Sequence, residues 1–145
     1  MRDEPVADPT LTVVGRAWSE WVLYEDERGL FPRSERSADL IPYESPGTAR
    51  PAVYEIARRK RGRGPPEVLF VGATTNPSEG LRNRLITHHS IDDPLYDRIV
   101  EALIRRYTLV ARFIQFDPGA GAGALQLAQT LRERFGSARY PWNGR

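Results

Sequence analysis

Arg84 and His88 are the residues of this sequence whose types and spacing most directly indicate chemistry. They lie four residues apart within 81–89, a segment that opens like a helix, so both side chains share one helical face. Upstream, Tyr54 lies in a short apolar run, and a dense Arg/Lys cluster occupies positions 58–63. A guanidinium offers forked hydrogen bonds that match the oxygens of a phosphate group. Together these residues predict a phosphate site built by one hairpin and the helix that follows it.

Length and composition limit the class of protein. The chain has 145 residues, of which 40% are hydrophobic and 28% charged, and this fits one globular domain. It contains no cysteine, which excludes disulfides and thiolate metal sites. No run approaches the roughly 18 apolar residues that a membrane span needs, and the acidic N-terminus lacks the apolar segment of a signal peptide. We therefore expect a soluble cytoplasmic protein without a membrane partner.

The distribution of charge separates two parts of the chain. Before Pro46 the carboxylates outnumber the arginines, whereas from Arg50 onward the balance is basic. All but one of the 21 basic residues are arginine, the residue suited to paired contacts with phosphate. The segment between 25 and 50 is rich in Pro, Ser, Gly and charge and reads as a long connection. We predict an N-terminal extension, 1–46, packed on a domain formed by 47–145.

The predicted elements follow the order strand, strand, helix, helix, strand, helix. Runs typical of strands lie at 53–57, 67–71 and 107–116. Helical spacing of apolar residues, or a helix start signal, occurs at 81–89, 94–106 and 125–135. This order predicts an α/β (α+β) fold with a small central three-stranded sheet flanked by helices.

Several local interpretations accompany this fold. The continuous apolar run 67–71 is typical of a buried central strand, and the Gly- and Pro-containing segment 58–66 predicts the turn before it. Residues 11–15 read as a strand, and 17–24 are ambiguous between strand and helix. The Gly-rich segment 117–123 predicts a loop, without the Lys-Ser/Thr of a phosphate-cradling loop.

Four motifs in this order resemble the GIY-YIG nuclease family, which takes its name from two strand triplets separated by a turn. Ala52-Val53-Tyr54 corresponds to the first triplet and Phe70-Val71-Gly72 to the second. Residues 81–88 match the helix of that family, in which Leu-x-x-Arg-Leu is followed by a His. Asn143, in a terminal Pro-x-Asn, matches its closing Asn. The resemblance covers residues 50–145.

The resemblance implies metal-dependent hydrolysis of a DNA phosphodiester. Tyr54 would activate the attacking water, Phe70 takes the place of a second Tyr, and Arg84 would offset charge on the phosphoryl oxygens. His88 takes part in some restriction-type members, and Asn143 closes the site. These five are the candidate catalytic positions. A Glu on the last helix holds one divalent cation, Mg or Mn, in such enzymes.

Two positions depart from the family pattern. Phe70 has no hydroxyl, so one hydrogen bond to the phosphate is lost. Counting back from Asn143, and matching Leu131, places the metal-binding Glu at Ala128, which cannot bind a cation. Three explanations stay open at this point: the chain is inactive, alanine was introduced at 128, or this register is wrong.

Each candidate also has a structural interpretation. Tyr54 could be an ordinary strand aromatic, Arg84 a solvated helix residue, and Asn143 a turn residue. The dipole at the end of a helix favours a histidine such as His88 equally well. The basic cluster could be a solvated turn, but its place beside a predicted phosphate site favours contact with the DNA backbone. The candidate nucleic-acid-binding residues are Arg58, Arg59, Lys60, Arg61, Arg63 and Arg82.

The leading hypothesis is thus a GIY-YIG-type DNA endonuclease, with activity in question because of Ala128. The alternative is a catalytically inactive nucleic-acid-binding module on the same fold. A third hypothesis is an adaptor whose acidic, Trp-bearing extension binds a protein. DNA is the expected partner, and a homodimer is left open.

Overall fold

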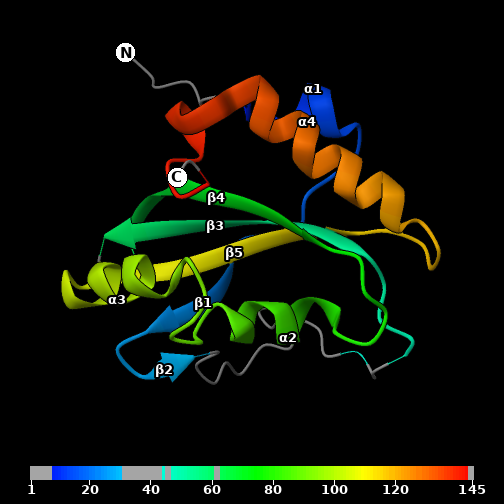
Figure 1. Cartoon of the computed structure of the whole chain (residues 1–145). Coiled ribbons are helices and arrows are strands. Elements are labelled where there is room, and N and C mark those ends of the chain that lie inside the picture. The colour runs from blue at the N-terminus through cyan, green and yellow to red at the C-terminus, as the bar shows by residue number, and fades with distance from the viewer. Residues whose placement is uncertain (1–7, 31–43, 45–46, 61–62, 144–145) are drawn as a thin grey trace, which may run out of the picture.

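The computed structural model describes residues 8–30, 44, 47–60 and 63–143, which form an antiparallel sheet with helices on both faces (Figure 1). Within the described residues the sheet has five strands, in the spatial order β2-β1-β5-β3-β4. The strands are β1 (Val22–Asp26), β2 (Gly29–Leu30), β3 (Ala52–Lys60), β4 (Arg63–Thr74) and β5 (Tyr107–Gln115). β3 pairs with β5 on one side and β4 on the other. The α+β class is as expected.

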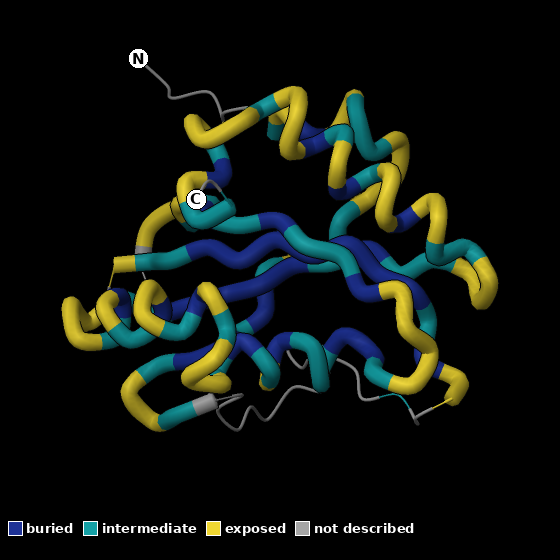
Figure 2. Tube along the Cα trace, viewed as in Figure 1, coloured by how far each residue is buried: buried dark blue, intermediate teal, exposed yellow. Residues whose placement is uncertain are grey.

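Helices cover the two faces of this sheet separately. They are α1 (Leu11–Val14), α2 (Gly80–Thr87), α3 (Tyr96–Ile104) and α4 (Gly121–Arg139). Figure 1 shows α1 and α4 over one face and α2 and α3 over the other. Because side chains of β3 alternate between faces, Tyr54 and Ile56 pack in the core with α2 and α3, whereas Val53 packs under α4. Figure 2 shows the buried strands between the two helical layers.

The predicted three-stranded sheet is too small. The three expected strands are β3, β4 and β5, but β1 and β2 continue the sheet beyond β5. β1 comes partly from the ambiguous segment 17–24, and its Val22 pairs with Ala111 of β5, far along the chain. The strand predicted at 11–15 is instead α1, a single helical turn that ends at Gly15. Both errors arise because short elements are fixed by distant contacts. The domain boundary near residue 47 stays a prediction.

β4 is an edge strand, not the central strand that its apolar run predicted. β3 continues to Lys60 and β4 begins at Arg63, so the expected turn at 58–66 is shorter; residues 61 and 62 lie outside the described residues. An edge position explains how β4 can include Pro65 and Pro66. Proline has no backbone N–H to donate, and a central strand would need such donors toward both neighbouring strands. Only Leu69 and Val71 of the run are buried, whereas Val68 and Phe70 are half-buried and Glu67 is exposed, although α4 and α2 both contact the strand.

The helices follow the predicted positions with shifted ends. α2 begins one residue before the segment predicted for it and α3 lies within its segment, whereas α4 begins inside the expected loop at 117–123 and reaches Arg139. Gly136, the expected stop, does end the regular helix, because its φ of 57° and ψ of −157° are non-helical, and a second short helical segment continues to Arg139. No helix in the described part of the chain is long and apolar enough to cross a membrane.

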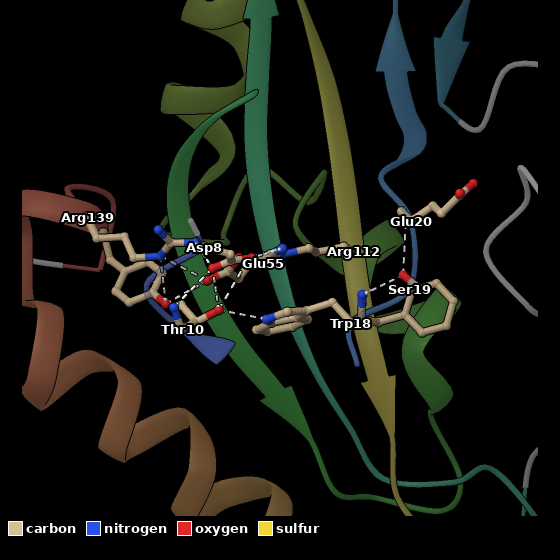
Figure 3. A network of polar contacts seen from close by, with 10 residues as sticks. Asp8, Thr10, Trp18, Ser19, Glu20, Glu55, Arg112 and Arg139 are labelled. Carbon is tan, nitrogen blue, oxygen red and sulfur yellow. Dashed lines mark hydrogen bonds and ion pairs between the residues drawn. The ribbon is translucent and has the colours of Figure 1, made fainter. Parts of the chain in front are cut away.

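A buried polar network crosses the α4 face of the sheet (Figure 3). Its centre is Glu55 of β3, which is 0% exposed. Arg112 of β5 donates from Nε to Glu55 Oε1 at 2.8 Å, and the Tyr140 hydroxyl donates to Oε2 at 2.6 Å. Arg139, at the end of α4, donates to both carboxylate oxygens at 3.2 Å. These bonds offset the cost of burying the carboxylate and tie the end of α4 to the sheet.

Arg112 also joins the first described residues to the sheet. Its guanidinium donates from Nη1 to Asp8 Oδ2 at 2.6 Å. It lies over the rings of Trp18 and Trp21, at 4.4 and 4.7 Å from their centroids. Trp18 Nε1 in turn donates to the Thr10 hydroxyl at 2.8 Å. The tryptophans of the N-terminal region are therefore part of a structural contact with β5.

We predict that Asp8→Asn lowers the free energy of unfolding by about 1–3 kcal/mol at neutral pH, because a charged hydrogen-bond acceptor is lost. Burial alone would raise the pKa of Asp8, but hydrogen bonds from Arg112 and Thr10 lower it from 3.8 to about 2. A carboxyl group whose pKa is lower in the folded state than in the unfolded state stabilises the fold at pH values above its unfolded-state pKa. This contribution disappears as the pH falls through its folded-state pKa. Urea unfolding should therefore show the difference from wild type vanishing toward pH 2.

The control for this prediction is Asp117→Asn, which removes the same charge from a side chain that is 93% exposed. It should leave the urea midpoint nearly unchanged at every pH. A difference between Asp8→Asn and wild type that stays constant down to pH 2 would contradict the proposed contact.

Candidate functional site

A pocket of about 370 Å³ lies at the outer edge of β4. β3, β4, α2, α4, the start of α3 and the C-terminal turn all contribute to its lining. Six predicted positions meet there, namely Tyr54, Phe70, Arg84, His88, Ala128 and Asn143. A larger hollow of about 870 Å³ lies between β1, α3 and β5, but none of the predicted site residues lines it. The smaller pocket is therefore the candidate site.

Tyr54, His88 and Asp93 form a hydrogen-bonded chain at this pocket. The Tyr54 hydroxyl lies 2.7 Å from His88 Nε2, and His88 Nδ1 lies 3.1 Å from Asp93 Oδ1. A carboxylate only accepts, so Nδ1 carries the ring proton and Nε2 accepts from the phenol. Asp93 Oδ1 also accepts the Leu95 N–H at 2.9 Å, which fixes the carboxylate at the start of α3. In the sequence, Asp93 precedes Pro94 at a predicted helix start, and nothing in that pattern predicts its bond to His88.

Burial sets the protonation of this chain. It lowers the pKa of His88 below its ordinary 6.5, although Asp93 opposes the shift. It raises the pKa of Tyr54 above its ordinary 10, although the Arg84 guanidinium opposes that shift by its charge and by a hydrogen bond. At neutral pH the imidazole is therefore neutral and the phenol keeps its proton. The pair can pass a proton from the phenol to the imidazole.

Gly72 makes room for the phenol. Tyr54 and Gly72 are partners across β3 and β4, and a Cβ at position 72 would lie 2.6 Å from Tyr54 Oη and 2.7 Å from Cζ. No real Cβ is tolerated so close to ring atoms, so only glycine fits beneath this tyrosine. Phe70 packs on the same group, with its ring centroid 6.0 Å from Tyr54 and 5.5 Å from His88. It supplies packing where a tyrosine would supply a hydroxyl.

Two guanidinium groups line the pocket from different layers. Arg84 comes from α2 and hydrogen-bonds the Tyr54 hydroxyl. Arg132 comes from α4, on the opposite face of the sheet, and was not predicted. A signal for it was available, because Arg132 lies four residues after Ala128 and so shares its helical face. The site is more basic than the sequence motifs indicated.

Asn143 lines the pocket, but both ends of its amide are already bonded. Its Oδ1 accepts the Val71 N–H and its Nδ2 donates to the Val71 carbonyl, both at 2.8 Å. The preceding residue, Trp142, donates its N–H to the Leu69 carbonyl at 2.9 Å. These bonds give the outer edge of β4 a partner. Asn143 holds the pocket wall, and its catalytic role stays a prediction.

The lining residues do not fit a divalent cation. Ala128 lines the pocket and is 3% exposed, so the position expected to hold a metal-binding Glu does face the site. Among the described residues, no group of three His, Cys, Asp or Glu side chains could hold a metal. Asp93, the carboxylate in the lining, already accepts bonds from His88 and Leu95. Since Mg²⁺ and Mn²⁺ need free oxygen ligands, the Mg or Mn cofactor stays a prediction that the donor set does not favour.

The basic hairpin does not line the pocket. Arg58 is paired with Glu67 at 2.8 Å and lies over the Tyr107 ring at 4.3 Å. Arg59 points to the opposite face of β3, where its buried Nε has no partner among the described residues. Lys60 is exposed, and Arg82 is half-buried on α2. Arg61 and the Arg63 side chain lie outside what the structure describes, and DNA contact by this set stays a prediction.

No protein-family model and no solved structure matches this chain. The resemblance to GIY-YIG nucleases therefore rests on the motifs and their arrangement in the pocket.

We predict that Gly72→Ala destabilises the fold by about 1–3 kcal/mol, because the added methyl group displaces the Tyr54 ring. The matched control is Gly123→Ala in α4, where a Cβ meets Phe116 at an ordinary 3.6 Å. That change should be neutral or stabilise by about 0.4–1 kcal/mol. Chemical unfolding measures both. Equal stabilities for the two variants would show that the phenol does not lie over Gly72.

Proposed function

We propose that this chain is a DNA endonuclease of the GIY-YIG type, which binds a phosphodiester in the β4-edge pocket and hydrolyses it. The observation that carries the proposal is the Tyr54–His88–Asp93 chain, which opens onto a pocket that also holds Arg84. Cations alone would support binding of phosphate. A neutral, carboxylate-oriented imidazole bonded to a phenol supplies in addition an acceptor for a proton, which hydrolysis requires.

The proposed proton path uses groups already in contact. As the oxygen of a water molecule bonds to phosphorus, the water gives a proton to Tyr54 and the phenol gives its own to His88 Nε2. The bond from phosphorus to the leaving sugar oxygen breaks, and that oxygen takes a proton from solvent. His88 later returns its proton to solvent, so one water is consumed. Arg84 stabilises the negative charge on the phosphoryl oxygens.

Access to the phenol depends on Arg84. Tyr54 is only 1% exposed, and Arg84 hydrogen-bonds its hydroxyl. A bound phosphodiester offers the guanidinium a charged partner in place of a neutral phenol. The hydrogen bond to the charged phosphate is the stronger of the two. Transfer of Arg84 from the phenol to the phosphate would then expose the phenol oxygen to the reacting water.

A second candidate function is binding of DNA without cleavage. It is favoured by Ala128, which leaves the pocket without the carboxylate of the family pattern, and by Phe70, which lacks a hydroxyl. The two functions share the phosphate pocket and differ in whether Tyr54 and His88 transfer a proton. Measuring binding and cleavage separately therefore distinguishes them.

We predict that Tyr54→Phe lowers cleavage of plasmid DNA by about 10²–10⁴-fold, because it removes the proton-transferring hydroxyl, and leaves the dissociation constant for DNA within about twofold. The matched control is Tyr140→Phe, which also removes a buried hydroxyl but on the opposite side of the sheet. Tyr140→Phe should lose stability and keep cleavage. Nicking assays and fluorescence anisotropy provide the two readouts.

The wild-type result decides between the candidates. Cleavage in at least one of Mg²⁺, Mn²⁺ or EDTA, lost in Tyr54→Phe, supports the endonuclease. Binding with no cleavage in any of the three conditions supports the binding module. Absence of both binding and cleavage, in a folded protein, contradicts the whole proposal.

The pH dependence of cleavage tests His88 separately. Because burial lowers the pKa of His88 below 6.5, the rate should fall only as pH drops below that value, where the imidazole becomes protonated. Asp93 raises this pKa, so Asp93→Asn should move the acid limb of the profile to lower pH. Asp97→Asn, which removes an exposed carboxylate of α3 outside the pocket, should leave the limb in place. If Asp93→Asn leaves the acid limb of the pH profile unchanged, His88 does not take part in the mechanism.

A further inference from the structure

Arg132 is a charged side chain in the pocket for which the described part of the chain shows no carboxylate partner. It is exposed, and it lies one helical turn after Ala128 on α4. Two other arginines on the α4 face of the sheet, Arg112 and Arg139, differ from it because both are paired with Glu55. An exposed guanidinium held at the mouth of a pocket and left unpaired is available to an anionic ligand.

The charges in the pocket suit one phosphodiester. Arg84 and Arg132 are the cationic side chains in its lining, and Asp93 is the carboxylate. Burial keeps His88 neutral at pH 7. Two guanidinium groups against one carboxylate leave a single net positive charge, and each phosphate of a nucleic acid carries a single negative charge. The net charge of the pocket lining therefore neutralises one phosphate without an added cation.

The edge of β4 adds a backbone donor. Leu69 and Val71 direct their backbone groups outward, to Trp142 and Asn143. Backbone groups alternate along a strand, so the N–H of Ala73 points to the same outer edge, beyond the last residue that the C-terminal turn pairs. Ala73 lines the pocket. A phosphate oxygen at this edge would meet a backbone N–H in addition to the guanidinium groups that line the pocket.

Resting on the proposed function, we infer that Arg132 takes the charge-neutralising role that a carboxylate-bound metal has in the family pattern. A phosphodiester is clamped between Arg84 of α2 and Arg132 of α4, and binding needs no divalent cation. Ala128 is consistent with this arrangement. A glutamate at 128, one turn before Arg132, would pair with that guanidinium and cancel its charge.

The first test compares Arg132→Met with Arg134→Met, an exposed residue of the same helix outside the pocket. DNA binding is measured by fluorescence anisotropy in EDTA and in Mg²⁺, over a range of salt concentrations. We expect wild type to bind equally with and without Mg²⁺. Arg132→Met should weaken binding by about tenfold and reduce the magnitude of the salt slope by about one, the effect of losing one phosphate contact. Arg134→Met should match wild type, and both variants should keep the wild-type melting temperature.

The second test is Ala128→Glu. We expect it to weaken DNA binding in EDTA as Arg132→Met does, because the new carboxylate occupies the guanidinium. If Ala128→Glu instead confers Mg²⁺-dependent cleavage that wild type lacks, the pocket is a metal site without its ligand, and the inference is wrong.

The two levels of the proposal fail in different ways. Arg84→Met should weaken binding if the pocket holds phosphate at all. If Arg84→Met weakens binding but Arg132→Met behaves as Arg134→Met, or if EDTA abolishes wild-type binding, the proposed function stands and the role of Arg132 is rejected. If wild type does not bind DNA in any of these conditions, both are rejected.

Discussion

The contact between the Tyr54 ring and the backbone of Gly72 is the constraint on which the site depends. A hairpin register that pairs these two positions lets an aromatic ring lie across the neighbouring strand where no side chain opposes it. From there its hydroxyl reaches His88, the residue that follows α2. A slip of one residue in this register would turn Tyr54 to the α4 face and bring Glu55 to the pocket face. The position of one hydroxyl is thus decided by the pairing of two whole strands.

The same strand carries two unlike polar groups on its two faces. Tyr54 opens to the pocket, while its neighbour Glu55 is bonded to Arg112 and Arg139 within the α4 layer. Buried ion pairs add little net stability compared with apolar packing, but breaking one is costly. The Glu55 network therefore favours one register of β3 over its alternatives. A fixed register is what the opposite face requires to hold a phenol against an imidazole.

Local patterns predicted the parts of the fold that local forces determine. The alternating and continuous apolar runs located β3, β4 and β5, and helical spacing located α2 and α3. They could not show that β1 pairs with β5, or that β4 lies at an edge, because both depend on contacts between distant segments. For the site, motif order placed Tyr54, Arg84 and His88 in one pocket. Asp93 was not predicted as a site residue, because a carboxylate before a proline is already explained by its place at the start of a helix.

The amide of Asn143 has a consequence for self-association. An open sheet edge offers unpaired N–H and C=O groups to strands of other molecules. Here the C-terminal turn bonds to Leu69 and Val71, so that part of the β4 edge is closed to intermolecular strand addition. Sheet-forming association through β2, at the other end of the strand order, would not involve this closed part of β4. A pairing through β2 would leave both pockets, which lie at the β4 edge, away from the contact between the two copies.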